Sequence, residues 1–410
     1  MSTSINQNFT ARTLLTFAMP SIIMMVFMSF YTIVDGIFVS RFVGSNALSS
    51  LNIVYPAINI LIAIASMLAT GGTAIISKYL GQNKKREANE ILLADYRRYL
   101  KILMLFAPMC MLQTLFQSYL ITAGKPALGL ILTIGAGILN GILDYIFIVP
   151  LNMGIGGAAF ATGIGQSIPA IAGCLFFFFS KKDLHFTRFT FHPKAVALAC
   201  YNGSSEMIGQ MSGAVITFLF NITLIRLVGE HGVAAVSILL YGQFLFNAFY
   251  MGFSIGISPI IGFQYGACNK ERLKNVYKIS ILFVIVSSVI LMMISILAAT
   301  PIVSVFTEDK ATFELAASGF KIFAVAFLFS GINITSSGIF TALSNGTISA
   351  IISFARTLVF TAICLLTLPP VLGITGVWIA VPAAEFLTTL LCIVMHMRYF
   401  VLPGKRNYIR

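Results

Sequence analysis

Two aspartates lie inside long apolar segments of the first half of the chain. Asp35 occurs in FYTIVDGIFV and Asp144 occurs in ILNGILDYIFIV. Asn140 precedes Asp144 by one helical turn, so the amide and the carboxylate share a helix face. An ionised side chain at the bilayer centre costs at least about 2.5–3.5 kcal/mol, which makes intramembrane carboxylates candidates for function. Thr162, near the start of the next apolar segment, is a candidate hydroxyl ligand from a neighbouring helix.

These four residues predict a site for a coupling cation. Two carboxylates in one dry pocket cannot both ionise cheaply, so they titrate as a coupled pair that takes up a proton or Na⁺. We expect no other metal and no cofactor. The six cysteines are scattered and lack the spacing of metal ligands.

The segments that must position these residues are membrane helices. Of 410 residues, 58% are hydrophobic and 10% are charged, whereas a soluble domain carries about 25% charged residues. A spanning helix needs about 20 mainly apolar residues. Blocks of that kind lie at roughly 14–39, 53–77, 102–122, 127–149, 157–180, 203–228, 237–262, 279–303, 320–341, 348–368 and 376–397. The predicted fold class is therefore an all-α polytopic membrane protein.

The net charge of +13 is concentrated in short basic clusters at 78–86, 181–194, 270–278 and 398–410. Basic loops of this kind are typical of the cytoplasmic side of a membrane protein. The charge therefore predicts contact with the lipid bilayer and the cytoplasm, and it is not taken as a sign of nucleic-acid binding.

The second half of the chain repeats the first. Gly44 and Gly81 recur at one common offset as Gly229 and Gly266, and each half ends in a similar Pro…Gly…Gly hairpin. The second unit is longer inside by about one membrane helix. We therefore predict two homologous bundles, with five spans in the first and six in the second. The boundaries are residues 1–180, a cytoplasmic linker at 181–202, and residues 203–410, which include a basic tail.

The uneven number of spans has a topological consequence. With three spans between them, the basic clusters at 78–86 and 181–194 lie on opposite faces of the membrane, although the charge pattern requires an even number. Either the segment 90–101 is handled unusually, or the first bundle has lost a helix. We favour the loss of a helix.

The two halves also differ at the acidic positions. By the repeat, Asp35 corresponds to Phe220 and Asp144 corresponds to Ile363. The alternative to a cation site is a satisfied polar network that holds the helices together. A packing role in the shared architecture predicts polar residues in both halves, so the asymmetry favours a function.

Three further residues are candidates for a substrate cavity. Glu206 begins the first span of the second half, where it either contacts substrate or ends a helix near water. Tyr31 lies one turn before Asp35, and Gln166 lies one turn after Thr162.

Two features of the spans are given a mainly structural interpretation. Arg356 and Glu385 lie in the last two spans, and we expect them to pair with each other. Pro20 interrupts the first span and is a candidate hinge, because proline removes a helix hydrogen bond; a static kink is the equal alternative.

Taken together, these motifs resemble the MATE (multidrug and toxic compound extrusion) transporters, most closely their DinF-like branch. The similarity covers nearly the whole chain and rests on VDGIFVSRFVG, on GFSIGISPIIGFQYGACNKERLK, on the two hairpins, and on Arg356 with Glu385. It implies two six-helix lobes around a cavity, in which H⁺ or Na⁺ enters in exchange for exported organic cations. In that branch, the cation site uses an Asp of the first helix, an Asn and an Asp of the fifth, and a Thr of the sixth. These match Asp35, Asn140, Asp144 and Thr162, whereas the third helix of the first lobe is missing here.

The predicted function is cation-coupled antiport that exports small, often cationic organic compounds by alternating access. We expect a monomer without enzymatic activity, in the cytoplasmic membrane of a bacterium or archaeon. A lipid-linked oligosaccharide flippase of the same superfamily is one alternative, although few basic residues lie deep in the spans. An inactive, internally deleted paralogue is another. A membrane enzyme is disfavoured, because no HExxH, DDxxD or GxSxG motif stands in a suitable context.

Overall fold

The described part of the chain is built from membrane helices. The computed structural model describes residues 9–42, 67, 72–82, 108–148, 150–151, 154–180, 184–186, 193–307 and 309–401. Its labelled helices are α1 (Ala11–Phe42), α4 (Pro108–Thr122), α5 (Pro126–Ile148), α6 (Gly154–Phe179), α7 (Pro193–Leu227), α8 (Glu230–Gly266), α9 (Lys270–Phe306), α10 (Lys310–Phe323), α11 (Phe327–Ala342), α12 (Gly346–Phe354), α13 (Thr361–Thr367), α14 (Pro369–Leu372) and α15 (Ile374–His396). Within these residues, 8 helical runs are long and apolar enough to cross a bilayer, which confirms an all-α polytopic membrane protein.

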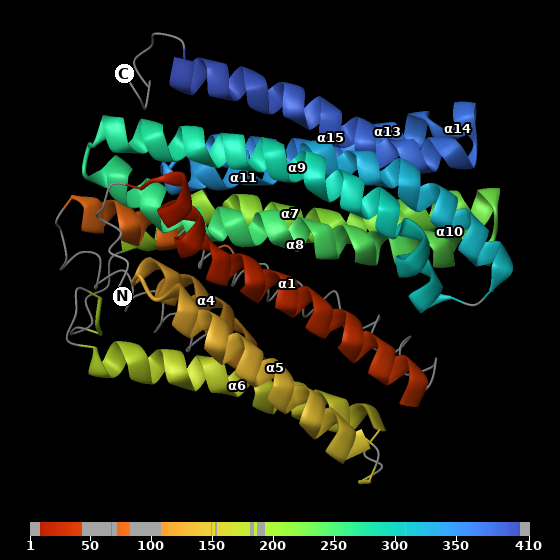
Figure 1. The fold of residues 1–410 in the computed structure, drawn as a ribbon, viewed down its shortest axis with the longest axis horizontal. Coiled ribbons are helices and arrows are strands. Elements are labelled where there is room, and N and C mark those ends of the chain that lie inside the picture. The colour runs from red at the N-terminus through yellow and green to blue at the C-terminus, as the bar shows by residue number, and fades with distance from the viewer. Residues whose placement is uncertain are drawn as a thin grey trace.

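Helices α1, α4, α5 and α6 pack together, with α5 between α1 and α6 (Figure 1). Small residues allow these close approaches, because helices in lipid associate through tight packing. A Cβ atom on Gly137 of α5 would lie 2.6 Å from the ring of Phe27 on α1. A Cβ atom on Gly173 of α6 would overlap the side chain of Phe116 on α4.

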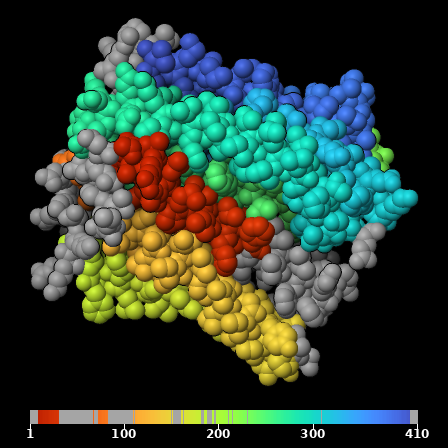
Figure 2. Space-filling model, viewed as in Figure 1, coloured from red at the N-terminus to blue at the C-terminus, as the bar shows by residue number. Residues whose placement is uncertain are grey.

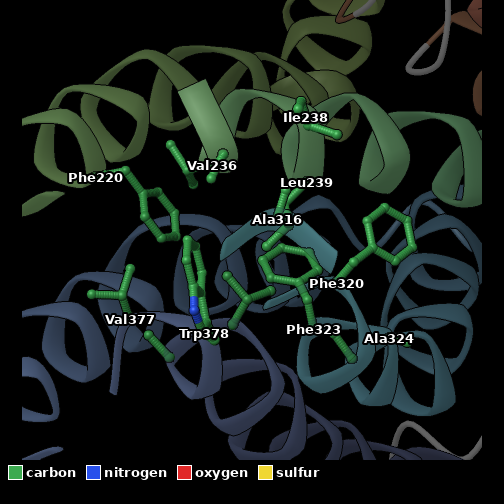
Figure 3. Close-up of a cluster of buried hydrophobic side chains, with 14 of the residues drawn as sticks. Phe220, Val236, Ile238, Leu239, Ala316, Phe320, Phe323, Ala324, Val377 and Trp378 are labelled. Atoms are coloured by element: carbon green, nitrogen blue, oxygen red, sulfur yellow. The ribbon is translucent and has the colours of Figure 1, made fainter. Parts of the chain in front are cut away.

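Helices α7 to α15 form the second group, around a core of buried hydrophobic side chains, aliphatic and aromatic (Figure 3). Trp378 of α15 lies near Phe220 of α7 and near Phe320 and Phe323 of α10 in this core. Gly319 makes room for the indole, since a Cβ atom there would lie 2.8 Å from Cε2 of Trp378. Such packing, rather than exclusion of water, holds helices together inside a bilayer.

The two groups meet along α1 and α8, which run antiparallel. Gly252 of α8 faces Ile22 of α1, and a Cβ atom on Gly252 would lie 2.6 Å from Cα of Ile22. Gly256 faces Ala18, and a Cβ atom on Gly256 would lie 3.0 Å from Cα of Ala18. In Figure 2, α1 is visible as a band between α9 and the pair α4 and α5. α1 therefore contacts both helix groups.

Several helix ends and basic residues meet at one end of the molecule, which we call the basic end. At the start of α1, the carbonyl of Phe9 accepts a hydrogen bond of 2.7 Å from Asn275 Nδ2 near the start of α9. Tyr277 of α9 bonds His396 at the end of α15, with 3.0 Å between the hydroxyl and Nδ1. The basic cluster 270–278 lies here, so the positive-inside rule makes this end cytoplasmic.

Two topological expectations are corrected by the fold. α7 begins at Pro193, so the second part of the predicted linker 181–202 is helical. The apolar pattern marks only the part of a helix that lies in lipid, and proline is well suited to the first turn that precedes it. The clusters 78–86 and 181–194 also do not lie on opposite faces: Ile76, Leu184 and Ala199 share one buried cluster, which places both near the basic end.

The proposed loss of a helix stays a prediction. The helix 72–81 runs toward the basic end beside α8, and the described part of the predicted block 102–122 is helical from Pro108, as α4. Residues 83–107, which connect these two helices, lie outside the described residues. The same holds for most of the predicted span 53–77.

A helix cap outside the membrane yields a prediction about pH. Asp309 caps α10: its carboxylate accepts a 2.9 Å bond from the backbone N–H of Thr312, and His231 Nδ1 lies 3.0 Å away. Hydrogen bonds from Thr312, and then His231, hold the pKa of Asp309 below its usual range. The ionised carboxylate of Asp309 therefore stabilises the folded protein fully at pH values above its unfolded pKa of about 3.9. This stabilisation is lost as pH falls through the lower pKa of the folded protein.

We expect Asp309→Asn to lower the thermal unfolding midpoint in detergent at pH 6, and we expect the difference from the wild type to be smaller at pH 3, below the unfolded pKa. Asparagine keeps the cap geometry, so the difference between the two proteins reports the charge alone. A difference that is equally large at both pH values would contradict this assignment.

Candidate cation-binding site

Asn140 and Asp144 share one buried face of α5. Their residues are 2% and 3% exposed, and the same face carries Ala136, whereas Ile138 and Ile142 on the opposite face are more than half exposed. The apolar exposed side of α5 is suited to lipid, and the polar side is turned to the neighbouring helices. α5 therefore presents an amide and a carboxylate to the interior of the first helix group.

α6 approaches this face closely. A Cβ atom on Gly165 would lie 3.0 Å from Cβ of Asn140 and 3.2 Å from the carbonyl oxygen of Ala136. Thr162 lies one turn before Gly165 in α6 and so belongs to the part of the helix that meets α5. The side chain of Thr162 lies outside the described part of the structure, and Gln166 is half-buried beside Gly165.

α1 runs parallel to α5 and brings Asp35 to the depth of Asp144. A Cβ atom on Gly129 would lie 3.9 Å from Met24 Sδ, and Gly137 meets Phe27, so both helices advance in the same direction. Asp35 follows Phe27 by about 12 Å of helix, and Asp144 follows Gly137 by about 10 Å. The two backbones thus carry their aspartates at the same level.

Only the backbone of this part of α1 is described. The side chains of Tyr31 and Asp35 lie outside the described part of the structure, and their roles stay predictions. α1 is α-helical through Pro20 from Ala11 to Phe42, and the hinge at Pro20 also stays a prediction.

The polar face extends to residues that the sequence did not single out. Gln117 of α4 donates a 2.7 Å hydrogen bond from Nε2 to Thr133 of α5, and both residues are buried. Thr133 lies two turns before Asn140 on the same face of α5. The helical spacing of Thr133, Asn140 and Asp144 could have identified Thr133 as part of the polar face from the sequence. Gln117 could be found only from the packing of α4 on α5.

A second polar cluster lies in the other helix group and contains the predicted pair. Arg356 donates from Nε to both carboxylate oxygens of Glu385, at 2.8 and 3.1 Å. Asn333 donates to Glu385 Oε2 at 2.6 Å, and Thr389 donates to Asn333 Oδ1 at 3.0 Å. The expectation that Arg356 and Glu385 pair is confirmed. Glu206 belongs to α7, which packs on α8 and α12, so the structure does not group it with Asn140 and Asp144.

Comparisons with known proteins point to one family of transporters. A family model described as MatE matches residues 20–95 and 207–366. The multidrug export protein MepA of Staphylococcus haemolyticus is 24% identical over 406 residues, which cover 89% of this chain and 88% of that relative. An outward-facing multidrug resistance MATE family transporter of the MOP superfamily has the same fold, with a TM-score of 0.87, 21% identity, and 95% and 96% of the two chains covered. A MOP superfamily transporter from Pyrococcus furiosus gives a TM-score of 0.85 at 19% identity, with the same two coverages.

Proposed function

Because this protein belongs to the MatE family, we propose that it exports small organic, often cationic compounds from the cell in exchange for H⁺ or Na⁺. Family membership makes it a multi-pass membrane transporter and not an enzyme. The name of its staphylococcal relative, a multidrug export protein, supports the export of varied compounds. The observation that carries the proposal is the buried pair Asn140 and Asp144, at a helix face that α1 and α6 both contact.

The contacts of α1 suggest how cation binding acts on substrate release. Binding of a cation at Asp144 and Asp35 removes negative charge from the α1–α5 contact and so changes how the two helices pack. α1 also packs on α8 through Ala18 and Ile22, which links this change to the interface between the two helix groups. A rigid change at that interface is what alternating access requires.

Several finer assignments belong to the same proposal. We place the protein in the DinF-like branch and in a bacterial or archaeal cytoplasmic membrane, as a monomer. The internally deleted, inactive paralogue is the alternative that the following experiment addresses.

Proteoliposomes that contain the full-length chain test the proposal. Vesicles are loaded with a fluorescent organic cation, and an inward gradient of H⁺, of Na⁺, or of neither is imposed across the membrane. We expect one of the two gradients to accelerate efflux and to drive it against a substrate gradient. Efflux that is equal in all three conditions would support the inactive paralogue and contradict the proposed function.

A further inference from the structure

Exposed basic side chains occupy the first turns of α9 at the basic end. Lys270, Lys274 and Lys278 recur every four residues and so lie on one side of the helix. All three residues are exposed. The same side continues one turn later with Leu282, which is 64% exposed, and then with Ile285, which is 45% exposed. The side of α9 that bears the lysines is therefore the side that faces lipid further along the helix.

The depth of these lysines matches the headgroup layer of the membrane. Leu282 begins the exposed apolar surface of α9, and a helix rises about 1.5 Å per residue, so Lys278 lies about 6 Å before it. The headgroup layer adds about 5–8 Å to each side of the hydrocarbon core. Lys278 therefore stands among the lipid headgroups, and the flexible side chain of Lys274, one turn earlier, reaches them from the aqueous side.

α1 has a similar arrangement beside α9. Arg12 is exposed in the first turn of α1, and Met19 and Ile23 on the same side of the helix are 42% and 44% exposed. Figure 2 shows α1 and α9 next to each other on one face of the molecule. Each of the two helices thus carries a cation near its start and exposed apolar side chains further along.

A hydrogen bond joins the two helix starts and brings Arg12 and Lys278 to a similar depth. The carbonyl of Phe9 accepts this bond from Asn275 Nδ2, at 2.7 Å. Arg12 follows Phe9 by three residues, Lys278 follows Asn275 by three residues, and both helices run away from the basic end. One cation therefore comes from each helix group at the place where the groups meet. Neither cation forms an ion pair with another residue that the structure describes.

Charge complementarity indicates what this surface binds. The first turns of α1 and α9 contain one carboxylate, Glu271, against Arg12 and the three exposed lysines. Neighbouring cations repel each other, and a phosphate group between them removes this repulsion and accepts charged hydrogen bonds from both. A headgroup with its own choline or amine offsets that gain, whereas a headgroup with a net negative charge keeps it. The exposed apolar sides of both helices are suited to the acyl chains of the same lipid.

We propose that the starts of α1 and α9 form a binding site for one anionic phospholipid, whose phosphate is held between Arg12 and Lys278. The acyl chains lie along the exposed apolar sides of the two helices. Because α1 and α9 belong to different helix groups, the bound lipid bridges the groups at the basic end and stabilises their contact there. This site is separate from the coupling cation and from the exported compound.

Native mass spectrometry of the purified full-length protein tests this site. The protein in detergent is mixed with equal amounts of phosphatidylglycerol and phosphatidylcholine with the same acyl chains, which share a phosphate but differ in net charge. We expect wild type to retain one phosphatidylglycerol in preference to phosphatidylcholine. Arg12→Gln and Lys278→Gln are each expected to lower this preference by about fivefold, because each removes one cation near the membrane surface. Lys278→Arg keeps the charge and is expected to keep the preference.

The matched control combines Arg226→Gln and Lys310→Gln, which remove one exposed arginine and one exposed lysine at the opposite end of the molecule. It is expected to retain the lipid as wild type does. A second control uses wild type alone: a wash with inorganic phosphate, compared with chloride at the same ionic strength, is expected to leave the lipid in place because the acyl chains also bind.

Three results would overturn this inference, and each would leave the exporter proposal standing. An unchanged preference in the double variant of Arg12→Gln and Lys278→Gln would show that these cations do not hold the lipid. Displacement by inorganic phosphate would show a site for a free anion instead of a lipid. Two retained lipids, of which each single variant removes a different one, would show separate sites and no bridge between the helix groups.

Discussion

Asp144→Asn is expected to abolish uphill transport while leaving the protein folded. Asparagine has nearly the shape of aspartate but does not ionise, so it cannot exchange a coupling cation. In one-for-one exchange, a tenfold inward cation gradient is worth about 1.4 kcal/mol and sustains an opposing substrate gradient of at most about tenfold. The variant is expected to sustain none, so that the substrate ratio across the vesicle membrane returns to one.

The measurement is the steady-state ratio of a fluorescent organic cation in proteoliposomes under an imposed gradient. Glu271→Gln is the matched control, because it makes the same carboxylate-to-amide change at an exposed position in the first turn of α9. It is expected to behave as wild type. Uphill transport by Asp144→Asn at the wild-type ratio would contradict the role of the α5 face.

The second large effect is expected at the basic end, where two glycines bring the helix groups together. A Cβ atom on Gly81 would overlap the backbone of Phe263 in α8 and of Ala267, which caps α8, and one on Gly266 would overlap the carbonyl of Lys78. Gly81 and Gly266 correspond in the internal repeat, so the equivalent glycine of each half packs directly against the backbone of the other half. Backbone atoms cannot move aside as a flexible side chain can, so Gly266→Ala is expected to prevent closure of this end.

Labelling of a buried reporter tests this expectation. Ser77 is fully buried beside Gly262, and Ser77→Cys in a chain whose native cysteines are replaced gives a thiol that maleimide reaches only when the basic end opens. We expect Gly266→Ala to raise the labelling rate by about tenfold or more and to reduce transport to background. Gly135→Ala is the control, because a Cβ atom there meets no atom of the described residues within 4 Å. Unchanged labelling together with full transport would show that closure does not depend on this contact.

Much of the architecture could be predicted because the bilayer imposes a simple rule on sequence. Each span must be a long apolar helix, so the blocks from 127–149 onward matched observed helices closely. The ends were less predictable: α7 continues to Pro193, outside the apolar block, because a helix does not have to stop where lipid stops. The opposite placement of two basic clusters was wrong, since a count of apolar blocks does not show where the chain runs between Gln82 and Pro108.

At the candidate site too, the features that depend on one helix could be predicted from the sequence, and those that depend on how helices pack could not. The shared face of Asn140 and Asp144 follows from helical spacing alone, and the pair Arg356 and Glu385 was expected because isolated charges in a membrane need partners. Gln117 was missed because an uncharged amide in a span has no distinctive pattern until α4 is seen to pack on α5. The contact of α1 with α8 was missed for a similar reason: Gly252 and Gly256 mark a close approach only when the partner is known.

The central claim is that the α5 face carries the coupling cation, and the flux of that cation tests it most directly. A gradient of the organic cation is imposed across proteoliposomes that start without a gradient of H⁺ or Na⁺. The movement of H⁺ is followed with a pH-sensitive dye, and that of Na⁺ with radioactive sodium. If the claim holds, wild type moves one of these ions in the direction opposite to the substrate, and Asp144→Asn moves neither. Equal ion movement in wild type and Asp144→Asn would contradict the claim.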